Sequence, residues 1–373
     1  MKILRKKSAF LFLTILLMLT LDPTQARSQQ GKTLLKVLDI NVWSGLDYIG
    51  TLTMGEYESA AIREKRYQAL VKQIKELDPD VIGVHEANRV PGYAKRLATD
   101  TGCVAFQHVG VGGVRLGPIG LPWNLREGDA ILVKKELNPE FVGRLQLSGG
   151  YVGKWVTFHF ADATQVLGIR ITVNQKPLHV YATHWHASLT DTPEIIKMAK
   201  DQVKKGHARP EEYQALLAEI KAGADWRQSE AEKTLNFIHD TAGKNPVILM
   251  GDFNAESDSR EIQTLIAQGM TDTFAHVNAN DPGYTWDPAT NLNQKAHYLN
   301  DAVSDNTSLM ESIQALDKTL SSRIDFIFAG PRDVIDSGQI AVKSSRVVMK
   351  EIIHGVHASD HYGIYSELLI AAP

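Results

Sequence analysis

The sequence predicts a mixed α/β protein in which two β-sheets pack against each other. Short apolar runs typical of buried strands recur between residues 34 and 370. Some of these runs follow each other directly, as on either side of the turn residues Asn174-Gln175-Lys176-Pro177, whereas others are separated by a helix. Hairpins combined with helix crossovers favour two mixed sheets over one purely parallel sheet.

The elements follow in chain order. Residues 34–41 have the pattern of a first strand, and residues 60–77 place Ile62, Leu70 and Ile74 on one helical face. Asp78 and Pro79 end that helix, because proline excludes the helical conformation from the residue before it. Further strands are expected at residues 80–85, 130–133, 153–160, 166–173, 178–183, 247–250, 324–328 and 364–370.

The composition limits the classes of protein and of site. The chain has 373 residues, of which 43% are hydrophobic and 22% charged, which excludes a disordered chain or one with many membrane spans. Its formal net charge is −3, so it lacks the overall basic field that many nucleic-acid-binding proteins carry. Cys103 is the single cysteine, which excludes an intramolecular disulfide and any multi-cysteine metal site.

Residues 1–26 have the pattern of a signal peptide. Lys2, Arg5, Lys6 and Lys7 precede an apolar run over residues 9–21, and Thr24-Gln25-Ala26 offers a cleavage site. We therefore expect an exported protein, periplasmic or secreted, with residues 27–373 as a single domain. An uncleaved anchor or a buried helix remains the alternative.

A charged stretch at about residues 190–228 differs from the rest of the chain. Pro210-Glu211-Glu212 is typical of a first helical turn. We interpret the stretch as a helical insertion on the same domain. A solvated flap, a gate over the substrate and a binding surface for a partner are its alternative roles.

Polar side chains gather where the predicted strands end, which is where α/β proteins assemble their sites. They are Asn41, Glu86, His184, Asp252, Asn254, Asp325, Asp360 and His361. Carboxylates from distant segments suit a hard cation, and Mg²⁺ needs only one or two of them. A base that activates water and donors that stabilise phosphoryl charge complete the residue types needed to hydrolyse a phosphate ester.

These residues occur in blocks whose order is similar to that of the endonuclease/exonuclease/phosphatase superfamily, which includes deoxyribonucleases and neutral sphingomyelinases. The blocks are Asp39-Ile40-Asn41, Val81-Ile82-Gly83-Val84-His85-Glu86, Glu127-Gly128-Asp129-Ala130-Ile131-Leu132, Ala182-Thr183-His184, Gly251-Asp252-Phe253-Asn254, Arg323-Ile324-Asp325-Phe326-Ile327 and Ser359-Asp360-His361. The resemblance implies a four-layered α/β/β/α sandwich with two packed mixed β-sheets. It also implies a divalent metal, Mg²⁺ or in its place Mn²⁺ or another divalent cation.

The resemblance suggests a role for each residue. Glu86 would be the main metal ligand, supported by Asn41, with Asp360 as a further ligand. His361 would activate water and Asp325 would orient it. Asp252 would handle protons of water or of the leaving group, Asn254 would hold phosphate oxygens, and His184 would donate to the phosphate.

Three residues depart from the pattern of the superfamily. Asp129 stands where asparagine is common, which puts the local hydrogen bonds in doubt. Trp185 replaces the usual leucine and would put an aromatic ring beside the phosphate. His186 is an additional histidine that would share a strand face with His184, so that the two could bind a softer metal.

The substrate is the least determined feature. Residues 283–291 are similar to a segment of bacterial sphingomyelinases, which suggests a phospholipid phosphodiester; the alternative is a loop whose aromatic residues only pack. The apolar residues 118–123 would allow peripheral contact with a membrane. We thus expect a phosphodiester substrate, either a lipid head group or a nucleic acid, and no protein partner is implied. An endonuclease is the main alternative, followed by a phosphomonoesterase and a non-catalytic binding module.

Overall fold

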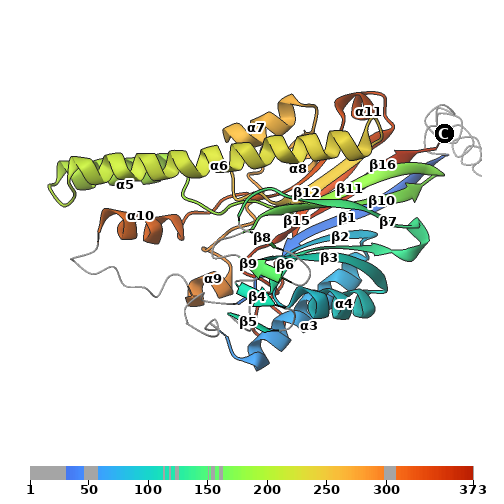
Figure 1. Ribbon diagram of the computed structural model, residues 1–373, viewed down its shortest axis with the longest axis horizontal. Coiled ribbons are helices and arrows are strands. Elements are labelled where there is room, and N and C mark those ends of the chain that lie inside the picture. Colours follow the sequence, from blue (N-terminus) through green and yellow to red (C-terminus); the bar gives the residue numbers. More distant parts are fainter. Residues whose placement is uncertain are drawn as a thin grey trace, which may run out of the picture.

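The computed structural model describes residues 31–45, 58–111, 114–116, 119–121, 126–149, 151–152, 156–158, 163–297 and 308–372. Two six-stranded sheets pack face to face there, and helices cover their outer faces (Figure 1). The order of the layers is helix, sheet, sheet, helix, which confirms the predicted α/β/β/α sandwich with two mixed sheets. The expected signal peptide, residues 1–26, lies outside the described residues.

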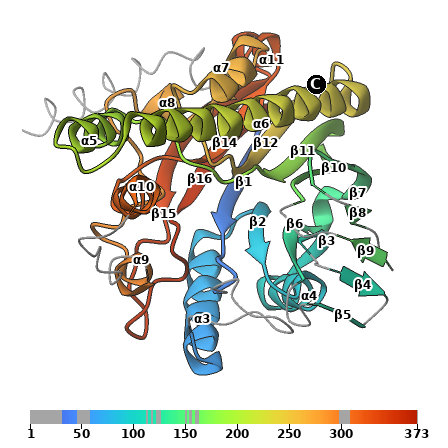
Figure 2. The same cartoon turned by 60° about the vertical axis from the view of Figure 1, so that its left-hand side comes forward.

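The first sheet has the strand order β15-β16-β1-β2-β6-β3. Its strands are β1 (Lys32–Asn41), β2 (Val81–Ala87), β3 (Cys103–Val111), β6 (Glu127–Lys134), β15 (Ile340–Val348) and β16 (Gly363–Ala371). Strands β1 and β2 are parallel because α3 (Ala60–Leu77) connects them, whereas their other neighbours are antiparallel. Helices α3 and α4 (Val90–Thr101) cover the outer face (Figure 2).

The second sheet has the strand order β13-β14-β12-β11-β10-β7. Its strands are β7 (Glu140–Gln146), β10 (Gln165–Val173), β11 (Lys176–His184), β12 (Val247–Asp252), β13 (Thr271–Asp272) and β14 (Asp325–Gly330). Strands β10 and β11 form the predicted hairpin, in which Asn174 and Gln175 have φ angles of 53° and 63°. Two consecutive positive φ angles are typical of the tight turn whose twist matches that of paired strands.

Three apolar layers hold the sandwich together. One lies between the sheets, where residues such as Val37, Ile131, Ile169 and Ile248 are fully buried. The second packs α3 and α4 onto the first sheet. The third packs α6 (Pro210–Ala242) and α7 (Arg260–Ala267) onto the second sheet. Burial of this apolar surface is the main favourable term in folding.

The charged stretch forms two helices, α5 (Pro193–Lys204) and the first part of α6. Helix α6 begins at Pro210, and its first turn is closed by Glu212, which accepts a hydrogen bond from the backbone N–H of Arg209 at 2.8 Å. The helix continues to Ala242 and so extends well beyond residue 228, because its second half packs on the second sheet. Helices α5, α6 and α10 (Leu309–Asp317) share a separate apolar cluster at one end of the molecule (Figure 1).

Some elements were not predicted. The edge strands β3, β7 and β15 mix polar with apolar residues, and β4 (Val114–Leu116), β5 (Ile119–Leu121) and β8 (Tyr151–Val152) belong to a small third sheet. The remaining strand of that sheet, β9 (Val156–Phe158), falls within the strand predicted at residues 153–160. Within the apolar stretch 118–123, residues 119–121 form β5, and Pro118, Pro122 and Trp123 lie outside the described residues. The remaining helices are η1 (Lys135–Leu137), α8 (Thr273–Val277), α9 (Leu292–His297) and α11 (Arg332–Asp336). Among the described residues, none of these helices has the length and hydropathy needed to span a membrane.

Candidate active site

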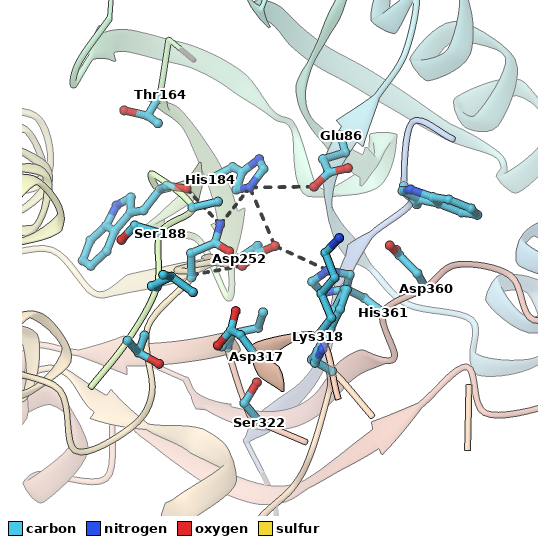
Figure 3. A pocket seen from close by; sticks show the side chains of 18 of the residues that line it. Glu86, Thr164, His184, Ser188, Asp252, Asp317, Lys318, Ser322, Asp360 and His361 are labelled. Atoms are coloured by element: carbon cyan, nitrogen blue, oxygen red, sulfur yellow. Dashed lines mark hydrogen bonds and ion pairs between the residues drawn. The ribbon is translucent and has the colours of Figure 1, made fainter. Parts of the chain in front are cut away.

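The predicted site residues meet at one edge of the sandwich because of the strand directions. Strands β1 and β2 are parallel, as are β11 and β12, so Asn41, Glu86, His184 and Asp252 all lie at carboxyl ends of strands. Asp252 is paired in register with His184 on one side and with Asp325 on the other. Figure 3 shows Glu86, His184, Asp252 and His361 pointing toward one another in a pocket.

Glu86, His184 and Asp252 form a group that can hold a metal ion. One ligand atom from each lies within 4.8 Å of the other two. Asn41 donates to Glu86 Oε1 at 2.8 Å and to Asp252 Oδ2 at 2.9 Å, while its own Oδ1 accepts a hydrogen bond from the backbone N–H of Trp43. The amide of Asn41 therefore holds together the two carboxylates of the group that can bind a metal, and its predicted role in supporting the metal ligand Glu86 stays a prediction.

The charge of this group fits a divalent cation. Burial would raise the pKa of Asp252, but the positive charges of His361 and His184 and a hydrogen bond from Asn41 hold that pKa below its usual value. Asp252 is therefore an ionised carboxylate that is 1% exposed. A buried carboxylate beside Glu86, with oxygen donors from two different strands, is the environment that hard cations prefer.

His361 and Asp325 form a buried pair next to the metal-binding group. Nδ1 of His361 lies 3.0 Å from Asp325 Oδ2, and Nε2 lies 3.9 Å from Asp252 Oδ2. Burial would lower the pKa of His361, but the carboxylates of Asp325 and Asp252 raise it well above its usual value. The pair has the arrangement expected of a base and the residue that orients it.

His184 and Asn254 lie on the other side of Asp252. Nε2 of His184 is 3.7 Å from Asp252 Oδ2 and 3.1 Å from the amide nitrogen of Asn254. Asn254 also donates to the carbonyl of Trp185 at 2.9 Å, and its φ angle of 48° belongs to the left-handed region. A side chain held in this uncommon backbone conformation is typical of functional sites.

The two neighbours of His184 lie in different surroundings. The ring of Trp185 is 1% exposed and packs edge to face on Phe253 at 4.6 Å, and Trp185 also lines the pocket that His184 enters. Strand β11 ends at His184, and the ring of His186 stacks on Trp226 at 4.0 Å. The structure thus does not bring His184 and His186 together as ligands of a softer metal.

Asp360 lines the pocket but does not belong to the groups that can hold a metal among the described residues. Burial raises its pKa to about 7. The loop that carries it is fixed from two sides: Asn291 donates to the carbonyl of Asp360 at 3.0 Å, and Arg66 donates to the carbonyl of Ala358 at 3.1 Å. Asp360 therefore faces the site from a firmly held loop.

Residues 283–291, whose sequence suggests a role with the substrate, lie next to His361 and contribute to the lining of the pocket. The ring of Trp286 packs against the ring of His361 at 5.1 Å and also lines the pocket. The hydroxyl of Thr285 accepts hydrogen bonds from the backbone N–H groups of Ile324 and Asp325, both at 3.2 Å. This segment therefore positions the pair of His361 and Asp325 as well as lining the pocket.

Two buried networks escaped the sequence analysis. His85 lies between the carboxylates of Asp39 and Asp129, and these raise its pKa well above the usual value although burial opposes them. Glu230 of α6 accepts hydrogen bonds from Thr164 and from the backbone N–H of His186. The first network could have been suspected from the sequence, because a histidine stands directly before Glu86 and Asp129 departs from the pattern of the superfamily. No feature of the sequence around Glu230 indicates the second network.

The outer walls of the pocket come from the charged insertion and from α10. The pocket has a volume of about 670 Å³, and Leu189, Thr190, Asp317 and Lys318 contribute to its rim. Burial raises the pKa of Asp317 to about 6. The pocket is therefore bounded by the helical part of the molecule as well as by the strand ends.

Comparison with known proteins gives a consistent family and fold. The family model described as "Endonuclease/Exonuclease/phosphatase family" matches residues 40–361. No curated protein matches the sequence.

Solved structures of the same fold have low sequence identity to this chain. D. rerio TDP2 complexed with a single-strand DNA product is 16% identical with a TM-score of 0.56, covering 90% of this chain and 99% of that one. A mannosyl-6-phosphatase of Bacteroides thetaiotaomicron is 14% identical with a TM-score of 0.54, covering 90% and 99%. The human nocturnin catalytic domain with bound sulfate is 12% identical with a TM-score of 0.51, covering 90% and 97%.

Proposed function

The chain belongs to the endonuclease/exonuclease/phosphatase family of phosphoester hydrolases, and from this premise we propose that it is an exported, Mg²⁺-dependent phosphodiesterase that acts on a small phosphodiester. We choose a small phosphodiester over a nucleic acid because of the charged side chains that line the pocket. Acidic residues dominate the charged part of its lining: Glu86, Glu127, Asp129, Asp252, Glu256, Asp317 and Asp360. Among the described lining residues, Lys318 is the only lysine and arginine is absent.

This charge disfavours a polyanion. Nucleic acids are held by lysines and arginines that neutralise several consecutive phosphates. A small phosphodiester brings a single negative charge, which a bound cation beside Glu86 and Asp252 would balance. The pocket is also lined by the apolar residues Trp43, Leu189, Trp286 and Leu320. In a phospholipid a phosphate joins a polar head group to an apolar part. Such a substrate would contact both the charged and the apolar residues of the pocket.

The residues of the chain divide the work of hydrolysis between them. Asp325 fixes the ring of His361 by binding Nδ1. His361 accepts a proton from water at Nε2 in its neutral form, which the neighbouring carboxylates disfavour because they raise its pKa, so hydrolysis should increase with pH as this form becomes populated. Asp252 keeps a negative charge next to both histidines. His184 and the amide of Asn254 supply donors for charge that builds up on the phosphate. A divalent cation, when bound, would polarise a phosphoryl oxygen and stabilise the leaving oxygen.

A nucleic acid is the second candidate substrate. It is favoured by the structural similarity to D. rerio TDP2, which was solved with a single-strand DNA product. A phosphomonoester is the third, because the mannosyl-6-phosphatase has the same fold. Export is part of the proposal and rests on residues 1–26 alone.

The test is a side-by-side assay of residues 27–373 with Mg²⁺, with Mn²⁺ and with a chelator. The substrates are sphingomyelin liposomes, single- and double-stranded DNA, bis-p-nitrophenyl phosphate and p-nitrophenyl phosphate. We expect chelator-sensitive hydrolysis of the lipid and of the aryl diester. Cleavage of DNA that falls steeply with salt would refute the small-substrate proposal. Preference for the monoester would refute the assignment as a diesterase.

A further inference from the structure

A buried group of three charged side chains lies directly behind Glu86. His85 is 0% exposed, and its Nε2 lies 2.9 Å from Asp39 Oδ1 while its Nδ1 lies 3.1 Å from Asp129 Oδ1. Asp39 belongs to β1 and Asp129 to β6, the two strands that flank β2. The imidazole therefore links three neighbouring strands through its two nitrogens.

This link lies at an irregularity of the sheet. Val84 pairs with Ala130 and Ala87 with Gly128, so two residues of β2, His85 and Glu86, lie opposite a single residue of β6. Such a bulge bends the strand and redirects a side chain. The residue that is redirected here is Glu86, whose φ angle is 53°. A non-glycine residue in this region persists only where its surroundings impose it.

The partners of His85 are themselves held in place. Oδ2 of Asp129 accepts a hydrogen bond from Gln165 at 3.0 Å, and Gln165 belongs to the second sheet. Asp39 fits because its neighbour is Gly83: a Cβ at that position would lie 2.3 Å from Asp39 Oδ1. His85 is thus held by residues of the first sheet and, through Gln165, by the second sheet. This arrangement requires glycine at position 83, because any side chain there would collide with Asp39.

We propose that Asp39, His85 and Asp129 form a positioning device that holds Glu86 where its carboxylate can meet Asp252 on a divalent cation. The inference rests on the proposed metal dependence of the enzyme. Asn41, which ends β1 opposite His85, donates a hydrogen bond to each of those two carboxylates and so holds the side chain of Glu86 as well. His85 touches neither the substrate nor the cation in this scheme, and acts only through the bulge.

The alternative is that the three charges merely stabilise the core. That explanation is weaker because a buried ion group often contributes less to stability than apolar residues of the same volume. It also predicts a different result. A purely structural group would change the stability of the protein and leave its metal affinity alone, whereas a positioning device must change the metal affinity.

The experiment measures Mg²⁺ and Mn²⁺ binding by calorimetry on residues 27–373, together with thermal unfolding and circular dichroism. In His85→Gln we expect the metal affinity to fall about 10- to 100-fold, as for other losses of outer hydrogen-bond partners. Combining His85→Gln with Asp129→Asn replaces the ion pair by two amides that can bind each other, so part of the affinity should return. Glu261→Gln breaks a buried ion pair between α6 and α7, neither of which carries a residue of the Glu86 group, and serves as the control for general destabilisation.

The outcomes separate this inference from the proposed function. Unchanged metal affinity in folded His85→Gln would overturn the positioning role and leave the proposed function intact. If His85→Gln does not fold, the nearly isosteric Asp129→Asn is measured in its place, with the same criterion. If the wild-type chain binds neither cation, both the metal dependence and this inference are wrong.

Discussion

Nδ1 of His361 lies 3.0 Å from Oδ2 of Asp325, on the side of the ring opposite to Asp252. The two residues are 36 positions apart and are brought together because Asp325 begins β14 while His361 precedes β16. Asp325 fixes which nitrogen carries a proton on the buried side, and this leaves Nε2 directed at the pocket.

The first prediction concerns this pair. His361→Ala should abolish Mg²⁺-dependent hydrolysis, and Asp325→Asn should lower kcat by about 10²- to 10⁴-fold, because general acid–base catalysis contributes on that order. Steady-state kinetics on the aryl diester measures both effects, with circular dichroism to show that the fold is retained. The exposed Glu211→Gln on α6 is the control. Wild-type rates in His361→Ala would remove it from the mechanism.

The second prediction concerns the requirement for metal. Glu86→Gln removes a charge from the group that can hold the cation, so the Mg²⁺ concentration needed for half-maximal activity should rise. The rise should exceed the about 10- to 100-fold that loss of an outer hydrogen-bond partner causes. Calorimetric titration of the same variant with Mg²⁺ should show the same loss. An unaltered metal requirement would assign the cation to other residues.

The third prediction is a dependence of stability on pH. Burial raises the pKa of Asp317 from 3.8 to about 6 in the folded chain. The native state therefore binds more protons than the unfolded state between these values, so stability falls as pH rises through this window. Asp317→Asn should be more stable than the wild type above pH 6 by about 1–3 kcal/mol and lose this advantage below about pH 4.

Urea denaturation of Asp317→Asn and the wild type at pH 4, 5, 6 and 7 checks this difference. Asp336→Asn, at an exposed aspartate of α11, is the control and should show no comparable trend. A stability difference that is constant across this range would show that burial does not perturb Asp317.

The fourth prediction concerns the attachment of the long helix. Arg227 of α6 and Glu261 of α7 form an ion pair at 2.6 Å in which both side chains are 2% exposed, and Arg227 also donates to Ser188 on the pocket wall. Arg227→Ala leaves a buried carboxylate without its partner and should lower the free energy of unfolding by about 3–5 kcal/mol.

The matched control lies on the same helix. Lys221 and Asp225 form an exposed pair, and Lys221→Ala should change the free energy of unfolding by less than about 1 kcal/mol. Denaturation curves of the two variants give the comparison directly. Equal effects would mean that α6 does not depend on its buried ion pair.

The positions of the site residues along the chain could be predicted from the sequence for a local reason. Each block is an apolar strand followed by a turn, so alternation and turn residues mark where Glu86, Asp252 and Asn254 stand. The turn at Asn174 and the helix end at Asp78, with a φ angle of 48°, follow from equally local chemistry. The edge strands β3 and β7 were missed because one-sided burial weakens their apolar pattern.

Partners that come from different sheets and strands could not be predicted. Asp129 was an unexplained departure in the sequence, and only the pairing of β2 with β6 shows that it faces His85. Asn41 was expected to help bind metal, and only the structure shows that its oxygen accepts from Trp43 and its amide holds two carboxylates. Which way a side chain turns depends on all its neighbours, and these are distant in the chain.

Short stretches of sequence were enough to identify the family, the sandwich of two mixed sheets and the set of polar residues at the strand ends, because strand periodicity and turn chemistry are properties of a few adjacent residues. Only the folded chain shows which carboxylate meets which histidine, that α6 extends to Ala242, and that the charged residues of the pocket are mostly acidic. These depend on packing between segments up to hundreds of residues apart, where strand register and burial select a single arrangement.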